Sequence, residues 1–486
     1  MKHKNLKLNY WILAAILGVP TTHIARADEE AEIAALKAQV QELDQKILEI
    51  EQQHKLEQTN IATYAKTLPT ITVGANGFVV ADANTNFVVG LHGTLQLDSR
   101  TFRNDDKIPG SSGFLLRRVR PILTGTVFHD FDFNFTPDFG NGTPGSASAV
   151  STPTVFDAYV NYHYSSAFQL EAGKFKTPIG LEQLQSDNNI SFNERSLATD
   201  LVPNRDVGVE LHGDLNDGMF SYAAGIFNGV GDERNTSNYN FQDNKEFDGR
   251  LFALPFKNSH TLAVKNLGVG LAGGWGDAST TNTLSLPNTT GGSLPGYTTD
   301  GQEQFFAYNP ASGSVVASGT HWRLSPQASY YYGPFGLLGE YVIDDQAVKT
   351  AGITPAHAAD LQNTAWEVTG GWVLTGEDAS FNGVVPKHAF NPRAGYWGAW
   401  QVVGRYAELN VDKAAFPYFS NPTTSASGAQ AWGVGLNWYL NKNIRADASF
   451  SHTTFTDGGS AAAAGAPGSV SSHPEDVFFT RLQLAF

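Results

Sequence analysis

The chain has 486 residues, of which 16% are charged and 12% aromatic, and it contains 49 Gly and no Cys. The absence of Cys excludes disulfide frameworks, thiolate metal sites and Cys nucleophiles, and the formal net charge of -15 argues against a nucleic-acid partner. The charged fraction is well below the ~25% that is usual in soluble domains. This composition fits two classes about equally: a barrel whose outer wall meets lipid, and a secreted β-sandwich or β-helix protein.

Residues 1–27 have the three parts of a secretory signal peptide. A basic start with three lysines is followed by an apolar stretch over residues 10–19 and an A-x-A cleavage site at residues 25–27. The apolar stretch is shorter than the ~20 residues that a spanning helix needs, and no later window is apolar over that length. Only helices and closed barrels satisfy their backbone hydrogen bonds in lipid, so a mature chain that enters a membrane must do so as a barrel.

Residues 28–68 are rich in Ala, Glu, Gln, Lys and Leu and contain neither Gly nor Pro. Eleven positions follow one another at alternating spacings of three and four, and nine of them are apolar: Ile33, Leu36, Val40, Leu43, Ile47, Ile50, His54, Glu57, Ile61, Tyr64 and Leu68. This 3.5-residue period predicts a coiled coil in the periplasm, and therefore an oligomer, with a weak lean toward a dimer. A single amphipathic helix lying on its own barrel is the alternative. Pro69 ends the helix.

Residues 69–86 are predicted to form a linker with a short strand segment, and the hydrophobic period then changes to two over residues 87–486. In residues 131–139 four Phe alternate with polar residues, and the same alternation occurs over residues 91–98, 322–330, 432–440 and 444–451. Each such strand has one apolar and one polar face. A soluble sandwich would also alternate, but here aromatic residues lie at the ends of the apolar faces, as membrane girdles require.

The chain ends on an amphipathic strand that closes with Phe486, similar to the last strand of outer-membrane barrels. Short and long connections alternate, as in bacterial barrels with short periplasmic turns and long outer loops. Eight long connections predict sixteen antiparallel strands: residues 101–113, 141–153, 177–206, 228–245, 277–320, 345–362, 409–429 and 455–473. The turn near residues 376–396 is long where a short one is expected. A barrel of this size leaves an aqueous lumen, which favours a channel.

Several stretches of the barrel resemble the phosphate-selective porin O and P family, through their order and spacing over some 350 residues. Those stretches are residues 90–98, the Arg-rich residues 116–120, then 172–182, 192–196, 203–208, 374–377, 398–400, 405–406 and 435–439. The resemblance implies a sixteen-stranded homotrimeric porin in the outer membrane of a Gram-negative bacterium. It also implies an anion pathway in which a ladder of Arg and a cluster of Lys guide phosphate to a constriction.

Strand alternation predicts which basic residues point into the lumen, because a basic residue on the lipid face costs about 2–4 kcal/mol at the midplane. Arg suits phosphate because its planar fork bonds two oxygens. Two like charges on one strand are costly without a purpose, which makes Arg118 with Arg120 and Lys174 with Lys176 the strongest candidates. The candidate pathway residues are Arg118, Arg120, Lys174, Lys176, Arg195, Arg205, Arg323, Arg405 and Arg445.

The alternative for each basic residue is a structural salt bridge with one of the acids that the same alternation places inside. Those acids are Asp98, Asp132, Asp157, Glu210, Asp248, Glu367 and Asp447. The long connection over residues 177–206 is predicted to fold inward as the constriction, lined by Arg195 and Arg205. An exposed loop held by local ion pairs is the other interpretation.

Four functions are compatible with a barrel of this kind. The first is a porin for passive uptake of anions, phosphate or polyphosphate foremost. The second is a general or cation-leaning diffusion pore, which the acidic lumen residues favour. The third is an enzyme barrel such as an outer-membrane phospholipase. The sequence argues against it, because it has no nucleophile motif with a general base at the required spacing. The fourth is an adhesin or anchor. The sequence predicts no enzyme, no cofactor, no metal site and no nucleic acid, with outer-membrane lipid and small inorganic anions as the partners.

Overall fold

The computed structural model describes residues 25–65, 67–103, 110, 112–140, 153–229, 244–279, 294, 296–308, 313–456 and 474–486. It divides into two compact units, one ending at Leu68 and the other spanning Pro69–Phe486. The predicted signal peptide lies outside the described residues up to residue 24, and residues 25–27 begin the first helix.

The first unit is the helix α1 (Ala25–Ala65). Ala, Glu, Gln, Lys and Leu are strong helix formers, which accounts for its length of 41 residues. The apolar positions of the 3.5-residue seam are exposed on this helix, from 46% for Leu68, just beyond its end, to 67% for Tyr64. The coiled coil stays a prediction. Within the described part of the chain, no helix combines the length and the apolar character needed to cross a membrane.

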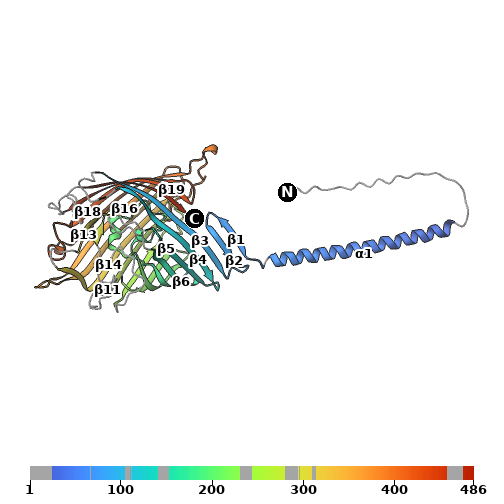
Figure 1. Cartoon of the computed structure of the whole chain (residues 1–486), viewed down its shortest axis with the longest axis horizontal. Helices are drawn as coiled ribbons and strands as arrows, with labels where there is room; N and C mark the ends of the chain where they lie inside the picture. The colour runs from blue at the N-terminus through green and yellow to red at the C-terminus, as the bar shows by residue number, and fades with distance from the viewer. Residues whose placement is uncertain are drawn as a thin grey trace. The chain divides into compact units, whose positions relative to one another are not determined.

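The second unit is a closed antiparallel barrel of sixteen strands, which confirms the predicted fold (Figure 1). Each strand pairs with the next, and β20 pairs with β3 to close the ring. The barrel strands are β3 (Val88–Arg103), β4 (Gly113–Val127), β5 (Phe131–Asp138), β6 (Thr154–Ser165), β7 (Phe168–Lys176), β8 (Arg205–Leu215), β9 (Phe220–Phe227), β10 (Glu246–Ala253), β11 (Leu267–Ser279), β14 (Ser314–Tyr332), β15 (Phe335–Ala351), β16 (Ala358–Val373), β17 (Ala399–Asn410), β18 (Gly428–Tyr439), β19 (Ile444–Thr456) and β20 (Glu475–Ala485).

The terminal residue takes part in the closure of the barrel. Leu482 lies opposite Leu97 in the β20–β3 register. Beyond the end of β20, the backbone N–H of Phe486 donates to the Gly93 carbonyl at 3.0 Å, and the Gly93 N–H donates back at 2.9 Å. A hairpin of β1 (Thr70–Gly74) and β2 (Gly77–Ala81) extends the sheet beside the start of β3.

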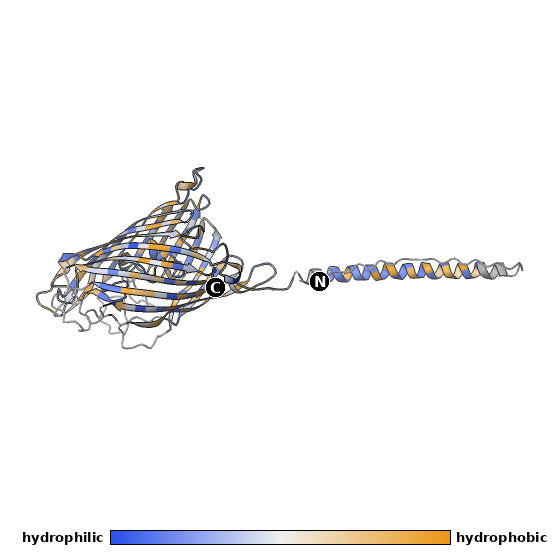
Figure 2. Cartoon of the chain, turned by 90° about the horizontal axis from the view of Figure 1, so that it is seen from above, coloured by the Kyte–Doolittle hydropathy of each residue, from blue (hydrophilic) through white to orange (hydrophobic). Residues whose placement is uncertain are grey.

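The two faces of the strands differ as the alternation predicts. Apolar residues such as Leu97, Trp432 and Val434 are 42–53% exposed on the outside, whereas Asp98 and Asn437 are 1% exposed inside. Figure 2 shows orange and blue residues following one another along the strands. The outer face therefore matches lipid, and the inner face is polar over most of the barrel.

The connections lie where the sequence predicts them, with one clear difference in length. β15 and β16 run further than expected, so the connection predicted over residues 345–362 shrinks to residues 352–357. Residues 254–266 form a long turn between β10 and β11, which includes the short helix η2 (Leu262–Val264). The long turn between β16 and β17 spans residues 374–398 and includes η3 (Pro392–Ala394).

Residues 177–204, between β7 and β8, fold into the barrel and carry α2 (Leu181–Leu184) and η1 (Leu197–Leu201). We call this segment the inner loop. Leu197 and Leu201 are 0–1% exposed and pack in an apolar cluster with inward residues of β15 to β17. The same cluster includes Tyr297 and Phe306 from the hairpin β12 (Gly296–Thr298) and β13 (Gln304–Ala307). The alternation of apolar and polar residues predicts a polar inner face at β15 to β17, whereas the structure has an apolar cluster there.

Candidate functional site

The inner loop is anchored to one wall of the barrel at α2. The backbone N–H groups of Leu181 and Glu182 donate to the buried Glu340 carboxylate of β15 at 2.7 and 2.9 Å. Gly180 just before α2 has φ 81°, and a Cβ there would lie 2.8 Å from Val202. Only Gly adopts this backbone at so close an approach without strain, so the sequence itself provides the bend that carries the chain into the lumen.

The opposite wall holds the inner loop through Glu194. Arg117 of β4 donates Nε to Glu194 Oε1 at 2.6 Å and Nη2 to Oε2 at 3.0 Å, while Arg100 of β3 donates to Oε1 at 2.8 Å. Burial by itself would raise the pKa of the Glu194 carboxyl. The guanidinium groups of Arg117 and Arg100 outweigh that effect and hold the pKa below its ordinary range.

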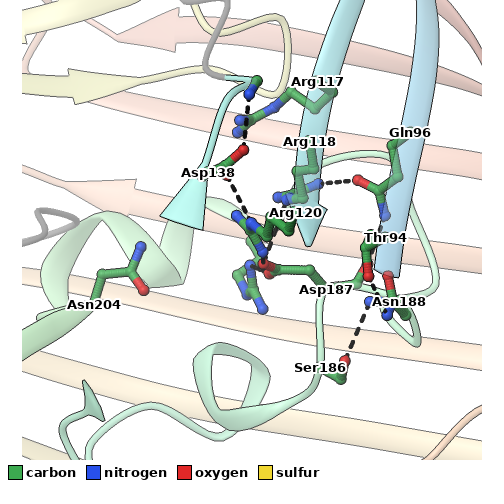
Figure 3. A network of polar contacts seen from close by, with 12 residues as sticks. Thr94, Gln96, Arg117, Arg118, Arg120, Asp138, Ser186, Asp187, Asn188 and Asn204 are labelled. Atoms are coloured by element: carbon green, nitrogen blue, oxygen red, sulfur yellow. Dashed lines mark hydrogen bonds and ion pairs between the residues drawn. The ribbon is translucent and has the colours of Figure 1, made fainter. Parts of the chain in front are cut away.

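A second loop carboxylate, Asp187, lies close to three arginines, two of which, Arg118 and Arg120 of β4, are drawn beside it in Figure 3. Arg118 Nε lies 3.3 Å and Arg195 Nη1 2.5 Å from its oxygens, and Arg120 bonds it as well as Asp138, the latter at 2.6 Å. Burial favours the neutral acid, but Arg118, Arg195 and Arg120 outweigh burial and hold the pKa of Asp187 well below its ordinary range. Asp187 is therefore a fixed negative charge at the meeting point of the loop and β4.

A β-bulge accounts for the dense arginines of β4. The register shifts so that Gln96 lies opposite Arg118 while Leu97 lies opposite Leu116, which leaves Arg117 as the extra residue. Arg117 and Arg118 consequently both turn inward, although they are neighbours in the chain. Strict alternation misses Arg117, because it places residues 117 and 118 on opposite faces.

The other predicted basic residues near the loop are also engaged. Lys176 donates Nζ to the Gln185 carbonyl at 2.7 Å. Arg205 is the first residue of β8, outside the inner loop, and its Nε lies 2.7 Å from Asp157. Arg205 also stacks on Phe156, whose ring centroid lies 3.4 Å from the guanidinium carbon. Lys174 is buried in β7 and interacts electrostatically with Arg205 and Asp157.

The three remaining predicted arginines lie elsewhere on the inner wall. Arg405 donates to Asp300 at 2.8 Å and to the Glu194 carbonyl at 2.9 Å. Arg445 bonds Asp447 at 2.9 Å and the Ile190 carbonyl at 3.1 Å. Arg323 pairs with Glu246 and lies 3.5 Å from Asp344. The seven predicted arginines thus all have carboxylate partners, and their roles in a solute pathway stay a prediction.

The charges are unevenly distributed around the ring. Three inward arginines lie on β4, and the neighbouring strands β3 and β20 each carry one buried arginine and one buried carboxylate. The inner faces of β10, β14, β15 and β16 carry five buried carboxylates and two arginines: Glu246, Asp248, Glu340, Asp344 and Glu367, with Arg250 and Arg323. β4 and β14 are eight strands apart in the sixteen-strand ring. The lumen therefore has a basic side and an acidic side.

A cavity of about 610 Å³ opens beneath the inner loop at the end with the short turns. Its lining includes Ser186 and Asn188 of the loop, together with Arg445 and Gln483 of the wall. Among the residues that the structure describes, no group of three or more His, Asp or Glu side chains is arranged to hold a metal ion.

A closed sixteen-stranded barrel with an apolar outer band, a charged interior and a loop folded into its lumen is an outer-membrane porin. A model of the family described as phosphate-selective porin O and P matches residues 89–486, and the chain belongs to this family. The resemblance seen in the sequence is thereby confirmed, as is the outer membrane of a Gram-negative bacterium as the location.

Known proteins similar to this chain include Porin O of Pseudomonas aeruginosa, which is 24% identical over 404 residues covering 77% of this chain and 84% of that protein. Among solved structures, the outer membrane channel DcaP of Acinetobacter baumannii has a TM-score of 0.48 at 10% identity, over 82% of this chain and 98% of that one. The anion-selective porin from Comamonas acidovorans has a TM-score of 0.47 at 12% identity, over 82% and 100% of the two chains.

Proposed function

We propose that this porin is a water-filled channel for the passive uptake of small anions, with phosphate as the foremost solute. The proposal rests mainly on the local charge around the inner loop, where seven basic side chains lie among four carboxylates. They are Arg100, Arg117, Arg118, Arg120, Lys176, Arg195 and Arg481 against Asp98, Asp138, Asp187 and Glu194. The excess positive charge lies in a narrow interior of low dielectric constant, where such a field concentrates anions.

The family description and the relative named Porin O support phosphate as the solute. In the proposed pathway, an anion passes weak positive sites that are strong enough to admit it and weak enough to release it. Arg118, Arg120 and Arg195 contribute to this field while they hold Asp187. Because these cations are already paired, we expect them to act through their field more than by direct binding.

A general or cation-leaning pore is the second candidate, and the acidic side of the lumen favours it. Glu340 and Glu367 lie directly opposite each other in the β15–β16 register, and both are buried. Like charges at such positions are destabilising, and although Glu340 also anchors the inner loop, the acidic side of the lumen would attract cations.

The reversal potential of the purified protein in a planar bilayer under a KCl gradient separates the two candidates. An anion-selective potential together with a chloride current blocked by low phosphate supports the proposal. Cation selectivity, or a current indifferent to phosphate, contradicts it and favours the second candidate. Both outcomes of this measurement are compatible with the porin fold.

The proposal includes the assembly and its parts: a cleaved leader over residues 1–27, a periplasmic coiled coil over 28–68, a linker over 69–86, and a homotrimer of barrels over 87–486. The exposed apolar seam of α1 supports association through this helix. Chemical cross-linking of the protein in native membranes tests the number of chains, and a band at three chain masses is the expected result.

A further inference from the structure

Residues 387–397, in the long turn between β16 and β17, project from the barrel wall as a folded element (Figure 1, orange). We call this segment the projection. At its tip, the backbone N–H of Asn391 donates to the Tyr396 carbonyl at 2.9 Å, and the Tyr396 N–H donates back at 3.1 Å. The helix η3 lies between these two residues. The ring of His388 stacks on that of Tyr396, with the centroids 4.2 Å apart. The projection therefore has a defined conformation of its own.

The projection lies at the end of the barrel with the short turns and against the lipid-facing wall. The Phe390 N–H donates to the Leu440 carbonyl at 2.6 Å, in the short turn between β18 and β19. The Phe390 ring contacts Trp397 and Trp438, at centroid distances of 5.7 and 5.2 Å. Trp438, on the outer face of β18, stacks on Trp400 of β17. Short turns face the periplasm and the aromatic residues of a barrel gather where lipid meets water, so the projection lies at the periplasmic surface of the membrane.

The projection is positively charged. No Asp or Glu occurs between residues 379 and 407, and the two acids of this turn, Glu377 and Asp378, precede the projection. Arg393 lies in the last turn of η3 and is exposed, and it forms no hydrogen bond or ion pair with the described residues. Lys387 is exposed as well, and its Nζ donates to one backbone carbonyl at 2.7 Å, which leaves two of its N–H groups for other acceptors. Two cations are therefore offered to the surroundings of the barrel.

We infer that the projection binds the headgroup of an anionic phospholipid in the periplasmic leaflet of the outer membrane. The planar fork of the Arg393 guanidinium group fits two phosphate oxygens at once, and Lys387 adds a second positive charge near the headgroups. Trp397 is 57% exposed, and indole rings favour the boundary between headgroups and acyl chains. A lipid occupies both kinds of group, whereas free inorganic phosphate would use only the cations. The inference is independent of the solute that the channel takes up.

The test is native mass spectrometry of the purified full chain, titrated with phosphatidylglycerol and with phosphatidylcholine of the same acyl chains. The wild type should bind phosphatidylglycerol more tightly. Arg393→Gln should weaken that binding about fivefold, the effect of one basic residue near an anionic surface. It should affect phosphatidylcholine less, because the choline group offsets the phosphate charge. Trp397→Ala should weaken the binding of both lipids, because it removes an apolar contact and no charge. Arg393→Lys should keep most of the preference.

Lys442→Gln is the matched control, because it removes one exposed positive charge from the neighbouring turn, where Lys442 donates to Asn76 Oδ1 at 2.7 Å. It should leave the lipid preference unchanged, and an unaltered single-channel conductance shows that the Arg393→Gln barrel is folded. Equal affinity of the wild type for the two lipids overturns the inference. A preference that survives Arg393→Gln combined with Lys387→Gln overturns it as well.

Two other occupants of the projection give different results. If inorganic phosphate at constant ionic strength displaces phosphatidylglycerol, the site takes a free anion. If Arg393→Gln changes the number of chains per particle, the projection contacts a second copy of this chain. Either outcome overturns the binding of a lipid headgroup. Phosphatidylglycerol that stays bound in the presence of phosphate, at an unchanged number of chains, supports it.

Discussion

Glu194 of the inner loop accepts two parallel hydrogen bonds from Arg117 of β4, at 2.6 and 3.0 Å. Paired bonds between a guanidinium fork and a carboxylate are among the strongest polar contacts in proteins. Arg100 donates to the same carboxylate at 2.8 Å. This arrangement fixes the middle of the inner loop against the basic wall.

Glu194→Gln is expected to loosen the inner loop, because it leaves Arg117 and Arg100 buried without their counter-charge. Breaking a buried ion pair from one side costs about 3–5 kcal/mol. We expect a lower denaturant midpoint for the barrel in detergent and larger fluctuations of single-channel current. Asp130→Asn removes one carboxylate from the exposed turn before β5 and serves as the matched control. Equal effects of the two substitutions would contradict the role of Glu194.

The pKa values of Asp187 and Glu194 predict how stability depends on pH. Both are held below the ordinary range in the folded barrel, while the unfolded values are about 3.9 and 4.3. A carboxyl with a lowered folded pKa stabilises the fold fully above its unfolded pKa, and this contribution is lost as the pH falls toward the folded value. We therefore expect the contribution of these groups to be constant from pH 7 to 5 and to decrease below about pH 4.

Denaturant midpoints at pH 7, 5 and 3 measure this dependence. Asp187→Asn and Glu194→Gln should each reduce the difference between pH 5 and pH 3, because each removes one linked carboxyl. A large decrease between pH 7 and pH 5 that either substitution abolishes would show that the carboxyl titrates near neutral pH, against this prediction.

The β-bulge in β4 predicts an unusual pattern of exposure to lipid. With the bulge, Leu116 and Val119 both face outward, although residues three apart in a regular strand lie on opposite faces. The chain contains no Cys, so a single Cys at either position can carry a fluorophore. Leu116→Cys and Val119→Cys labels should both be quenched by lipids with a spin label in the acyl chain.

Ala448 and Ser451 of β19 give the control pair, because they too are three residues apart and their strand has no register shift. A label at residue 448 should be quenched and one at residue 451 protected. If the labels in β4 behave like this control pair, with one of them protected, the bulge is absent.

The barrel could be predicted from the sequence because the alternation of apolar and polar residues is a local pattern that repeats from strand to strand. The alternation that predicts an inward Asp248 also predicts an inward Arg250, so the orientation of Arg250 can be predicted from the sequence. Arg117 could not be predicted, because a bulge depends on the register with the neighbouring strand. The contacts of Glu194 with Arg117 and of Asp187 with Arg118 could not be predicted either, since a loop sequence does not show which distant strand it will meet.

The apolar cluster inside the barrel illustrates the same limit. Leu361 and Leu409 lie on inner faces that alternation treats as polar. Their packing partners include Leu197 of the inner loop and Phe306 of the β12–β13 hairpin, which are more than a hundred residues away from one another. Only the tertiary fold shows that these inward side chains pack against other parts of the protein and do not face the aqueous lumen.

The seam of α1 gives the last prediction, which concerns association between chains. Ile47 belongs to the 3.5-residue seam, while the adjacent Leu48 lies off it, and both are about half exposed on the single helix, at 51% and 55%. If the helices associate through the seam, Ile47 becomes buried and contributes about 1.5–3 kcal/mol per chain. Ile47→Lys should then lower the temperature at which the oligomer dissociates on gels, and Leu48→Lys should leave it unchanged. Equal shifts for the two variants would indicate that α1 associates through another face or remains a single helix.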